Sequence, residues 1–289
     1  MRPTSTPGAP VRRPPARRLT PARVAVYAVL VLGAVVFAYP FVWMALATLR
    51  PEAELGRLSP IPETWTLASY RHVFETIPLG RAFLNSVLVS ALVTTSALVF
   101  GSMAAYALAK LEWRGRGLAL GVVLFSMTVP GIVLLIPLYT LVVALGWTDS
   151  YAGLVAPAMM NATAVLVLRQ QFLTIPGELL DAARIDGCSE ARILFRIVWP
   201  LSRPALVTAG ILVLLGTWND VLWPLIVIRT EAKMTMPQMV ALYAVGGGSG
   251  ARLGPQLAAA LLLALPIVAL YLVFERQFVA SLASSGLKG

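Results

Sequence analysis

The chain alternates between long apolar runs and shorter polar segments. About 20 consecutive apolar residues are enough to cross the hydrocarbon core of a bilayer as one helix. The pattern therefore predicts six spanning helices, at about residues 24–48, 84–109, 118–141, 151–172, 205–228 and 256–274. An even number of spans places both ends of the chain on the same side of the membrane.

Composition agrees with a membrane protein. Of the 289 residues, 58% are hydrophobic and 12% are charged, whereas soluble domains hold about 45–50% and about 25%. The formal net charge of +10 is compatible with nucleic-acid binding, but the basic residues lie at the N-terminus and between apolar runs, without a stripe of stacking aromatics. We therefore predict an all-α membrane protein with no nucleic-acid partner.

Basic residues are distributed unequally between the two sets of loops. The N-terminal segment, the 110–116 and 169–203 loops and the C-terminal segment hold 16 of the 23 Lys and Arg residues, and the 50–81 and 229–252 loops hold the other 7. Cytoplasmic loops of membrane proteins are enriched in Lys and Arg. We therefore expect both termini and the 169–203 loop to be cytoplasmic.

The same pattern predicts the domain organisation. Residues 1–23 are rich in Pro, Ala and Arg and predict a disordered basic cytoplasmic tail. Residues 24–276 predict one six-helix membrane domain, and residues 277–289 a cytoplasmic C-terminal tail. Although Ala45–Ala47 is similar to a cleavage site, the first apolar run exceeds the roughly 7–15 residues of a signal-peptide core, so we interpret it as a span.

Candidate catalytic chemistry is scarce. Cys188 and His72 are the single residues of their types, which leaves no internal disulfide and no Cys/His metal cluster. The glycine-rich stretch at 246–250 lacks the Gly-Lys-Ser/Thr of a phosphate-binding loop. No nucleophile with a supporting base is visible. We expect no catalytic site and no metal site in this chain.

The segment at residues 174–206 is the longest charged interruption in the second half of the chain. Pro176 and Gly177 should end the preceding helix, residues 178–185 fit about two helical turns, and Gly187 suits the left-handed turn that ends them. Small side chains on one stripe of this short helix would let another protein come close. The stripe consists of Leu179, Ala182, Ala183 and Asp186.

A second helix is expected after Gly187. Ser189 can cap its first turn, and its apolar side chains should pack inward before two prolines lead into the next span. The apolar residues are Ile193, Leu194, Ile197 and Val198, and the prolines are Pro200 and Pro204.

The 174–206 segment resembles the EAA loop of the membrane subunits of bacterial ABC importers. The matching residues are Asp181-Ala182-Ala183, Asp186-Gly187, Ile197, Pro200-Leu201 and Pro204. Asp181 replaces the usual Glu and Cys188 the usual Ala, and both changes are small. In that family the loop is a coupling helix that sits in a cleft on the ATP-hydrolysing subunit. The resemblance implies this docking role for Glu178, Leu179, Asp181, Ala182, Ala183, Asp186 and Gly187.

From about residue 24 to its end, the chain also resembles the MalG-like branch of carbohydrate importer permeases. The matching stretches are Asn85-Ser86-Val87, Ala104 to Lys110, Ile136-Pro137-Leu138, Trp218-Asn219-Asp220, Trp223-Pro224-Leu225, and Phe278-Val279-Ala280 with Gly286 to Gly289. The resemblance implies a type I importer permease fold in the bacterial cytoplasmic (inner) membrane. It also implies a sugar, an oligosaccharide or a related polyol or glycerophosphodiester as the solute; a permease for a non-sugar solute is the alternative.

The resemblance implies several partners. A solute-binding protein outside would deliver the substrate to a pathway between this chain and a second MalG/MalF-type permease, and an ABC ATPase dimer would bind the coupling helix. ATP and Mg would be cofactors of the ATPase, and none would belong to this chain. The rival interpretation, an ion-coupled secondary transporter, requires membrane-embedded ionisable residues for ion coupling, whereas Asp220 stands nearly alone in the spans.

Polar residues inside the predicted spans are the candidates for the transport pathway. A carboxylate deep in the bilayer costs about 2.5–3.5 kcal/mol, so Asp220 should face a cavity, the bundle interior or the outer interface. Asn85, Trp218 and Asn219 are further candidates, although small polar residues commonly join helices without touching solute. Kinks at prolines would open the helices around a cavity or simply shape their packing. These prolines are Pro130, Pro137, Pro157, Pro224 and Pro266.

Cys188 offers a direct test of the predicted orientation. Because the 174–206 segment should be cytoplasmic, a membrane-impermeant thiol reagent should label this single cysteine only from the cytoplasmic side, and less when the ATPase is bound. The mass shift of the chain, compared between intact cells and inside-out vesicles, measures the labelling. Labelling in intact cells would contradict the topology.

Overall fold

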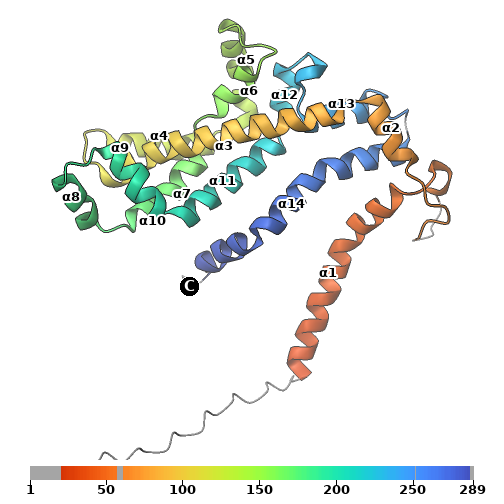
Figure 1. The fold of residues 1–289 in the computed structure, drawn as a ribbon, viewed down its shortest axis with the longest axis horizontal. Helices are drawn as coiled ribbons and strands as arrows, with labels where there is room; N and C mark the ends of the chain where they lie inside the picture. Colours follow the sequence, from red (N-terminus) through yellow and green to blue (C-terminus); the bar gives the residue numbers. More distant parts are fainter. Residues whose placement is uncertain (1–20, 57–60, 251, 287–289) are drawn as a thin grey trace, which may run out of the picture.

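A computed structural model describes residues 21–56, 61–250 and 252–286. Residues 1–20 of the predicted N-terminal tail (1–23) lie outside the described residues. The same holds for residues 287–289 of the predicted C-terminal tail (277–289). The described part consists of helices joined by turns and loops (Figure 1). The α-helices are α1 (Pro21–Ala47), α2 (Ala68–Thr76), α3 (Leu79–Lys110), α4 (Arg116–Thr128), α5 (Leu135–Ala144), α6 (Tyr151–Val155), α7 (Ala162–Leu173), α8 (Gly177–Ile185), α9 (Glu190–Ile193), α10 (Trp199–Leu201), α11 (Arg203–Trp218), α12 (Leu222–Val227), α13 (Met236–Val245) and α14 (Leu253–Gly286).

The predicted number of spans is recovered when each bent pair of helices counts as one span. Three continuous helices are long and apolar enough to cross a membrane, and these are Val24–Ala47, Leu79–Lys110 and Leu253–Leu272. Three pairs bend by 98°, 40° and 90° between their halves: Arg116–Thr128 with Gly131–Ala144, Tyr151–Ala158 with Ala162–Leu173, and Glu190–Leu201 with Arg203–Trp218. The described residues therefore form an all-α membrane fold with up to six spans.

The run predicted at 118–141 is broken at Pro130 rather than kinked. A residue that precedes proline avoids the helical region, and Val129 is accordingly extended, with φ −81° and ψ 118°. The chain bends there by 98° between α4 and the helical stretch that leads into α5. Pro137 lies in the first turn of α5, and Pro157 lies in the short 3₁₀ turn between α6 and α7.

The run predicted at 205–228 is also divided. α11 ends at Trp218, and Pro224 lies in the first turn of the separate helix α12, where a missing N–H removes no helix hydrogen bond. The expectation that Pro224 kinks one continuous span is therefore wrong. Pro266 lies inside a helix as predicted, and that helix, α14, continues to Gly286.

α3, α7 and α11 pack side by side around the larger hydrophobic core (Figure 1). α3 presents the small residues Ala97, Gly101 and Ala105. A β-carbon placed on Gly101 would lie 3.5 Å from that of Ala164 on α7, so the two backbones approach closely. The core continues along α7 to the fully buried Phe172.

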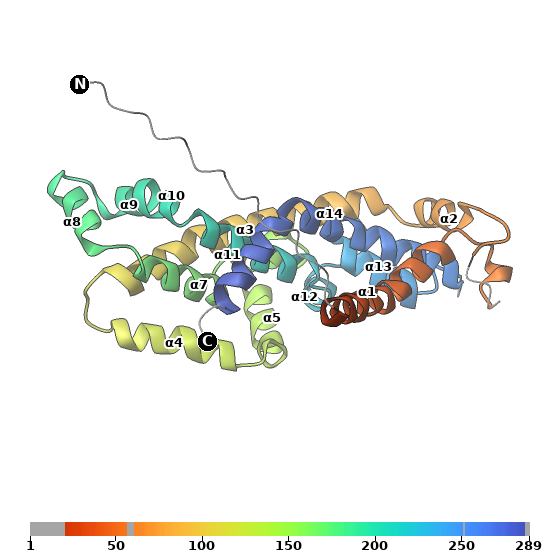
Figure 2. The same cartoon turned by 90° about the horizontal axis from the view of Figure 1, so that it is seen from below.

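Two long helices flank this core. α14 packs against α13 and α11 around a second buried cluster that includes Met239, Tyr243 and Ala258. α1 diverges from the other helices (Figure 1; Figure 2 shows the same arrangement turned by 90°), and residues 24–42 of its apolar stretch are exposed within this chain, whereas Ala47 at its end is buried. An apolar helix of this length must be covered by lipid or by another protein.

Polar side chains fasten one end of α3 to neighbouring segments. The Asn85 amide nitrogen donates to the carbonyls of Ala232 (3.0 Å) and Met234 (2.8 Å), and its oxygen accepts from the Tyr151 hydroxyl (2.8 Å). The adjacent Ser86 hydroxyl accepts the first backbone N–H of α13 at 2.7 Å. Asn85 is 6% exposed and makes three hydrogen bonds, so it joins α3 to α6 and to the loop before α13.

Replacing Asn85 should destabilise the fold. Asn85→Ala leaves two carbonyls and one hydroxyl without their partner, and each unsatisfied buried group costs about 1–3 kcal/mol. We expect a lower thermal unfolding midpoint of the detergent-purified protein. Ser96→Ala, on the same helix but with hydrogen bonds only to carbonyls of its own turn, is the matched control. Equal midpoints for the two variants would contradict the joining role.

Candidate functional site

The predicted helix–turn–helix is present at one end of the bundle (Figure 1). α7 ends at Leu173, and α8 follows the extended residue Pro176. Gly187 has φ +78°, which confirms the left-handed turn. The Ser189 hydroxyl accepts the N–H of Arg192 and caps α9, as predicted. Gly187 therefore sets the turn after α8, and Ser189 sets the start of α9.

α8 does not expose the whole of the predicted stripe. Leu180 and Ala183 are 1% and 7% exposed and belong to the main core, so Ala183 is not on the outer surface of this chain. Leu179 is 44% exposed, and Ile185, which the pattern did not single out, is 87% exposed. Glu178, Asp181, Ala182, Asp186 and Gly187 are also exposed. A surface available for docking therefore includes Ile185.

An ion-pair network joins α8 to α9. The Arg184 guanidinium donates to Glu190 (Nε to Oε1, 2.8 Å) and to Asp181 (Nη1 to Oδ1, 2.6 Å). Arg184, Asp181 and Glu190 have side chains that are 35%, 64% and 43% exposed, and pairs so close to solvent contribute little stability alone. Their main effect is to fix the orientation of Arg184 between the two helices.

The second helix buries the predicted apolar residues. Ile193, Leu194 and Val198 are at most 3% exposed, and Ile197 packs against the same core. Residues Leu194–Val198 form a π-helical turn, which is a local widening of the helix. The helix that ends with α10 then meets α11 at an angle of 90°.

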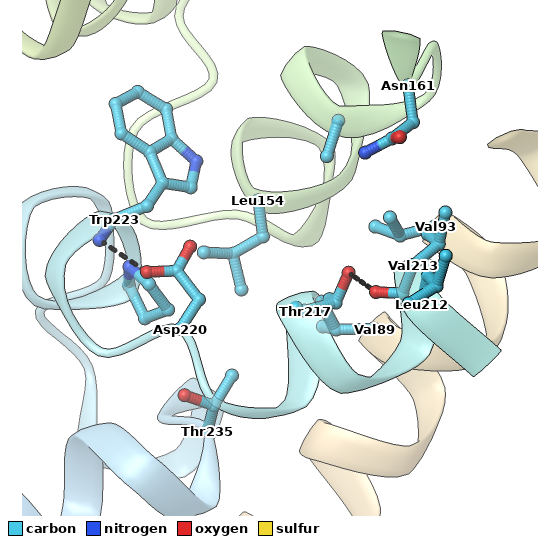
Figure 3. A pocket seen from close by; sticks show the side chains of 13 residues that line it. Val89, Val93, Leu154, Asn161, Leu212, Val213, Thr217, Asp220, Trp223 and Thr235 are labelled. Atoms are coloured by element: carbon cyan, nitrogen blue, oxygen red, sulfur yellow. Dashed lines mark hydrogen bonds between the residues drawn. The ribbon is translucent and has the colours of Figure 1, made fainter. Parts of the chain in front are cut away.

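Asp220 lines a cavity of about 230 Å³ inside the bundle (Figure 3). One carboxylate oxygen accepts the backbone N–H of Trp223 at 3.3 Å, and the Trp223 indole N–H donates to the Gly153 carbonyl at 3.0 Å. The remaining wall comes from α3, the α6–α7 region and α11, and from one residue before α13. The lining residues are Val89, Val93, Leu154, Ala158, Asn161, Leu212, Val213, Gly216, Thr217, Asp220, Trp223, Pro224 and Thr235.

The cavity retains hydrogen-bonding capacity. The Thr235 hydroxyl is buried and has no hydrogen-bond partner among the described residues. The Thr217 hydroxyl donates to its own helix at Val213 and can still accept, and the Asn161 side-chain oxygen caps α7 through Ala164. The walls are mostly apolar with a few convergent polar groups, an arrangement typical of small-molecule sites.

The neighbours of Asp220 point elsewhere. Trp218 is 5% exposed, contacts Phe83 edge-on at 5.9 Å between ring centres, and lines a second, mostly apolar cavity beside Pro266. Asn219 is exposed, and its amide nitrogen donates to the Leu215 carbonyl of its own helix. Of the four predicted pathway candidates, only Asp220 lines the larger cavity.

Asp149 organises a loop junction that no pattern in the sequence indicates. Its carboxylate accepts the hydroxyl (2.6 Å) and N–H (2.9 Å) of Thr230, the Lys233 ammonium (3.0 Å) and the N–H of Arg229 (3.1 Å). These hydrogen bonds hold the pKa of the Asp149 carboxyl well below its usual range, and those from Thr230 have the largest effect. Its positive φ of 51° is a signal of a special position, but it is visible only in the structure. Within the described residues no group of His, Cys, Asp and Glu could hold a metal ion.

The chain is similar along most of its length to known permease proteins. It is 37% identical over 256 residues to the arabinooligosaccharides transport system permease protein AraQ of Halalkalibacterium halodurans, covering 87% of this chain and 91% of that protein. It is 34% identical over 252 residues to the trehalose transport system permease protein SugB of Mycobacterium tuberculosis, covering 86% and 92%. It is 31% identical over 268 residues to the sn-glycerol-3-phosphate transport system permease protein UgpE of Escherichia coli, covering 90% and 95%.

The fold and a family model agree with these similarities. The structure matches a chain of a bacterial ABC transporter involved in the import of the acidic polysaccharide alginate, with a TM-score of 0.76 and 24% identity, over 91% of this chain and 99% of that one. This match confirms the predicted importer permease fold. The model of binding-protein-dependent transport system inner membrane components matches residues 97–279, which include the cavity-lining residues except Val89 and Val93, and also residues 174–206, called here the α8 segment. The chain therefore belongs to the family of binding-protein-dependent transport system inner membrane components.

Proposed function

We propose that this chain is one permease subunit of an ATP-driven importer for a sugar, an oligosaccharide or a related polyol or glycerophosphodiester. Members of the family are transporter subunits, so the chain is a multi-pass membrane protein and not an enzyme. The sugar class is supported by the names of the relatives, which include arabinooligosaccharide and trehalose permeases with at least 34% identity. The observation that carries the proposal is α8, a short helix with an exposed face at one end of a membrane bundle.

The partners follow from this assignment. A nucleotide-binding dimer would hold ATP and Mg and bind the exposed face of α8, including Leu179, Ala182, Asp186 and Ile185. ATP can drive transport only if this contact differs in free energy between the open and closed states of the dimer. A second permease would complete the pathway, and an external binding protein would deliver the solute. The basic N-terminal segment and loops support cytoplasmic termini in the bacterial inner membrane.

The Asp220 cavity is the proposed contribution of this chain to the solute pathway. Its polar groups can exchange hydrogen bonds with hydroxyls, and its apolar wall suits the C–H face of a sugar ring. A volume of about 230 Å³ is below the roughly 300–1,000 Å³ of pockets that enclose drug-sized ligands, so the cavity would accept one ring rather than a chain of sugars. The buried hydrogen bonds of Asn85 support a role in joining helices instead.

Purification from the source cells in mild detergent tests the assignment. The tagged chain should co-purify with an ATPase, and proteoliposomes of the complex should take up a radiolabelled sugar only with internal ATP and the external binding protein. A panel of neutral sugars, polyols and sn-glycerol 3-phosphate would identify the solute. ATP-independent uptake driven by an ion gradient would reject the proposal in favour of a secondary transporter.

Gly187→Val provides the specific variant for the same assay. A β-branched side chain is disfavoured at φ +78°, so the turn after α8 should distort and uptake should fall while membrane levels stay normal. Gly146→Val is the matched control, since Gly146 has φ +69° in the loop before α6. Equal losses in the two variants would indicate general strain and contradict the coupling role.

Asp220→Asn should impair uptake without impairing assembly. Asparagine keeps the acceptor for the Trp223 N–H but removes the charge. Hydrogen bonds to charged groups contribute about 1.5–3 kcal/mol, so we expect an uptake efficiency about 10- to 100-fold lower, with unchanged ATPase binding. Asn219→Ala, outside the cavity, is the control. Wild-type uptake by Asp220→Asn would rule out the pathway role of this carboxylate.

A further inference from the structure

One stripe of α3 contacts the α8 segment at three points. Ser102, Tyr106 and Lys110 follow one another at intervals of four residues, which places them on the same face of the helix. The Lys110 ammonium donates to the carbonyl of Ile175, which precedes α8, and the Tyr106 hydroxyl donates to Glu190, which follows α8. The Ser102 hydroxyl accepts the indole N–H of Trp199 in α10 at 3.0 Å. α3 therefore holds the segment on both sides of α8.

These contacts are shielded from water at Ser102, Tyr106 and Ile175, whereas the Glu190 side chain is 43% exposed. Ser102 and Tyr106 are 0% and 3% exposed, and Ile175 is 6% exposed. A hydrogen bond in such surroundings is stronger than at the surface, and an unpaired buried partner is costly. Loss of its partner would therefore leave Ser102 or Tyr106 as a buried polar group without a hydrogen bond.

Glu190 connects α8 itself to this stripe. Its Oε2 accepts from Tyr106 on α3, and its Oε1 accepts from Arg184 on α8 at 2.8 Å. The other partner of Arg184, Asp181, lies on α8 and cannot transmit movement out of that helix. The Glu190 carboxylate is therefore the polar bridge from α8 to α3 among the described residues.

The covalent route from α8 towards the opposite end of the bundle is poorly suited to transmit movement. It passes a π-helical turn at Leu194–Val198 and a 90° bend before α11. α3, in contrast, is a single helix of 32 residues without an internal proline. At about 1.5 Å per residue it spans about 48 Å. Near its other end, Asn85 and Ser86 hold the loop before α13 and, through Tyr151, α6.

We propose that α3 is the strut that carries movement of α8 across the membrane, and that Tyr106 and Glu190 are the positioning residues that attach α8 to it. This inference rests on the proposed function as an ATP-coupled permease subunit. Neither residue lines the Asp220 cavity, so they act through α8 and not on the solute. Nucleotide-driven displacement of α8 then reaches the segment 232–236 through the Asn85 and Ser86 hydrogen bonds.

A fluorescent label on the segment before α13 tests this transmission without knowledge of the solute. Glu231→Cys, at an exposed position of that segment, is labelled in a Cys188→Ala background in the purified complex with its ATPase. ATP with vanadate should change the fluorescence of the reference complex. In Tyr106→Phe the equilibrium between the two fluorescence states should shift back about tenfold, equivalent to about 1.4 kcal/mol, with ATPase binding and vanadate trapping retained. The fluorescence response, not the folding or assembly of the complex, is the measured quantity.

Tyr243→Phe is the matched control, because Tyr243 is also 3% exposed and its hydroxyl has no hydrogen-bond partner among the described residues. Its response should equal that of the reference. The fluorescence response should fall in Glu190→Ala by at least as much as in Tyr106→Phe. The response of the double variant should be no lower than that of Glu190→Ala, because both substitutions remove the same hydrogen bond.

The outcomes separate this inference from the proposed function. Absence of an ATPase from the purified complex would contradict the proposed function. If the ATPase binds and traps nucleotide but the fluorescence response is unchanged in Tyr106→Phe, or absent in the reference complex, the proposed role of α3 is contradicted and the proposed function is not. If Glu190→Ala fails to assemble, Tyr106→Phe still decides, because it preserves the ring and removes only the hydroxyl.

Discussion

The need to satisfy backbone hydrogen bonds without water is the constraint on which this structure depends. A break in a spanning helix exposes N–H and C=O groups that lipid cannot pair. Here two broken regions partner each other: Trp223 after one break donates to Gly153 beside the other, while Asp220 accepts the N–H of Trp223. Gln238, 1% exposed, donates to the carbonyl of Ile228 at the end of α12. The Asp220 cavity therefore lies where two broken spans meet.

The lengths of the apolar runs predicted the number of spans, six when each bent pair counts as one, because the thickness of the bilayer acts on each run independently. The breaks were less predictable. Pro130 is a local signal, and the bend there follows from the extended residue before it. The break around Asp220 contains no proline, and it depends on the Asp220 carboxylate, which accepts the N–H of Trp223 in the first turn of α12, and on the contact of Trp223 with α6, which is distant in sequence. Proline positions alone therefore misplaced this break.

The α8 segment shows the same division between local and distant causes. Gly187 and Ser189 act on their own turns, so the helix–turn–helix was predictable. The buried face of α8 was not predictable, because Leu179 and Leu180 are equally apolar. Which of the two is buried depends on the core formed by other helices. The Tyr106–Glu190 bond joins residues 84 positions apart, and no local pattern indicates it.

The polar groups of α3 are distributed in a way that suits a moving element. The helix packs closely against α7 through small residues, and a β-carbon placed on Gly101 would lie 3.5 Å from that of Ala164. Its side chains that hydrogen-bond to other segments are Asn85 and Ser86 near one end and Ser102, Tyr106 and Lys110 towards the other. Directional bonds near both ends and close packing between them make α3 a rigid connection between residues 174–206 and the loop before α13. The broken spans have no such continuity, so α3, the long unbroken helix of the larger core among the described residues, is the element best able to connect the two ends of the bundle.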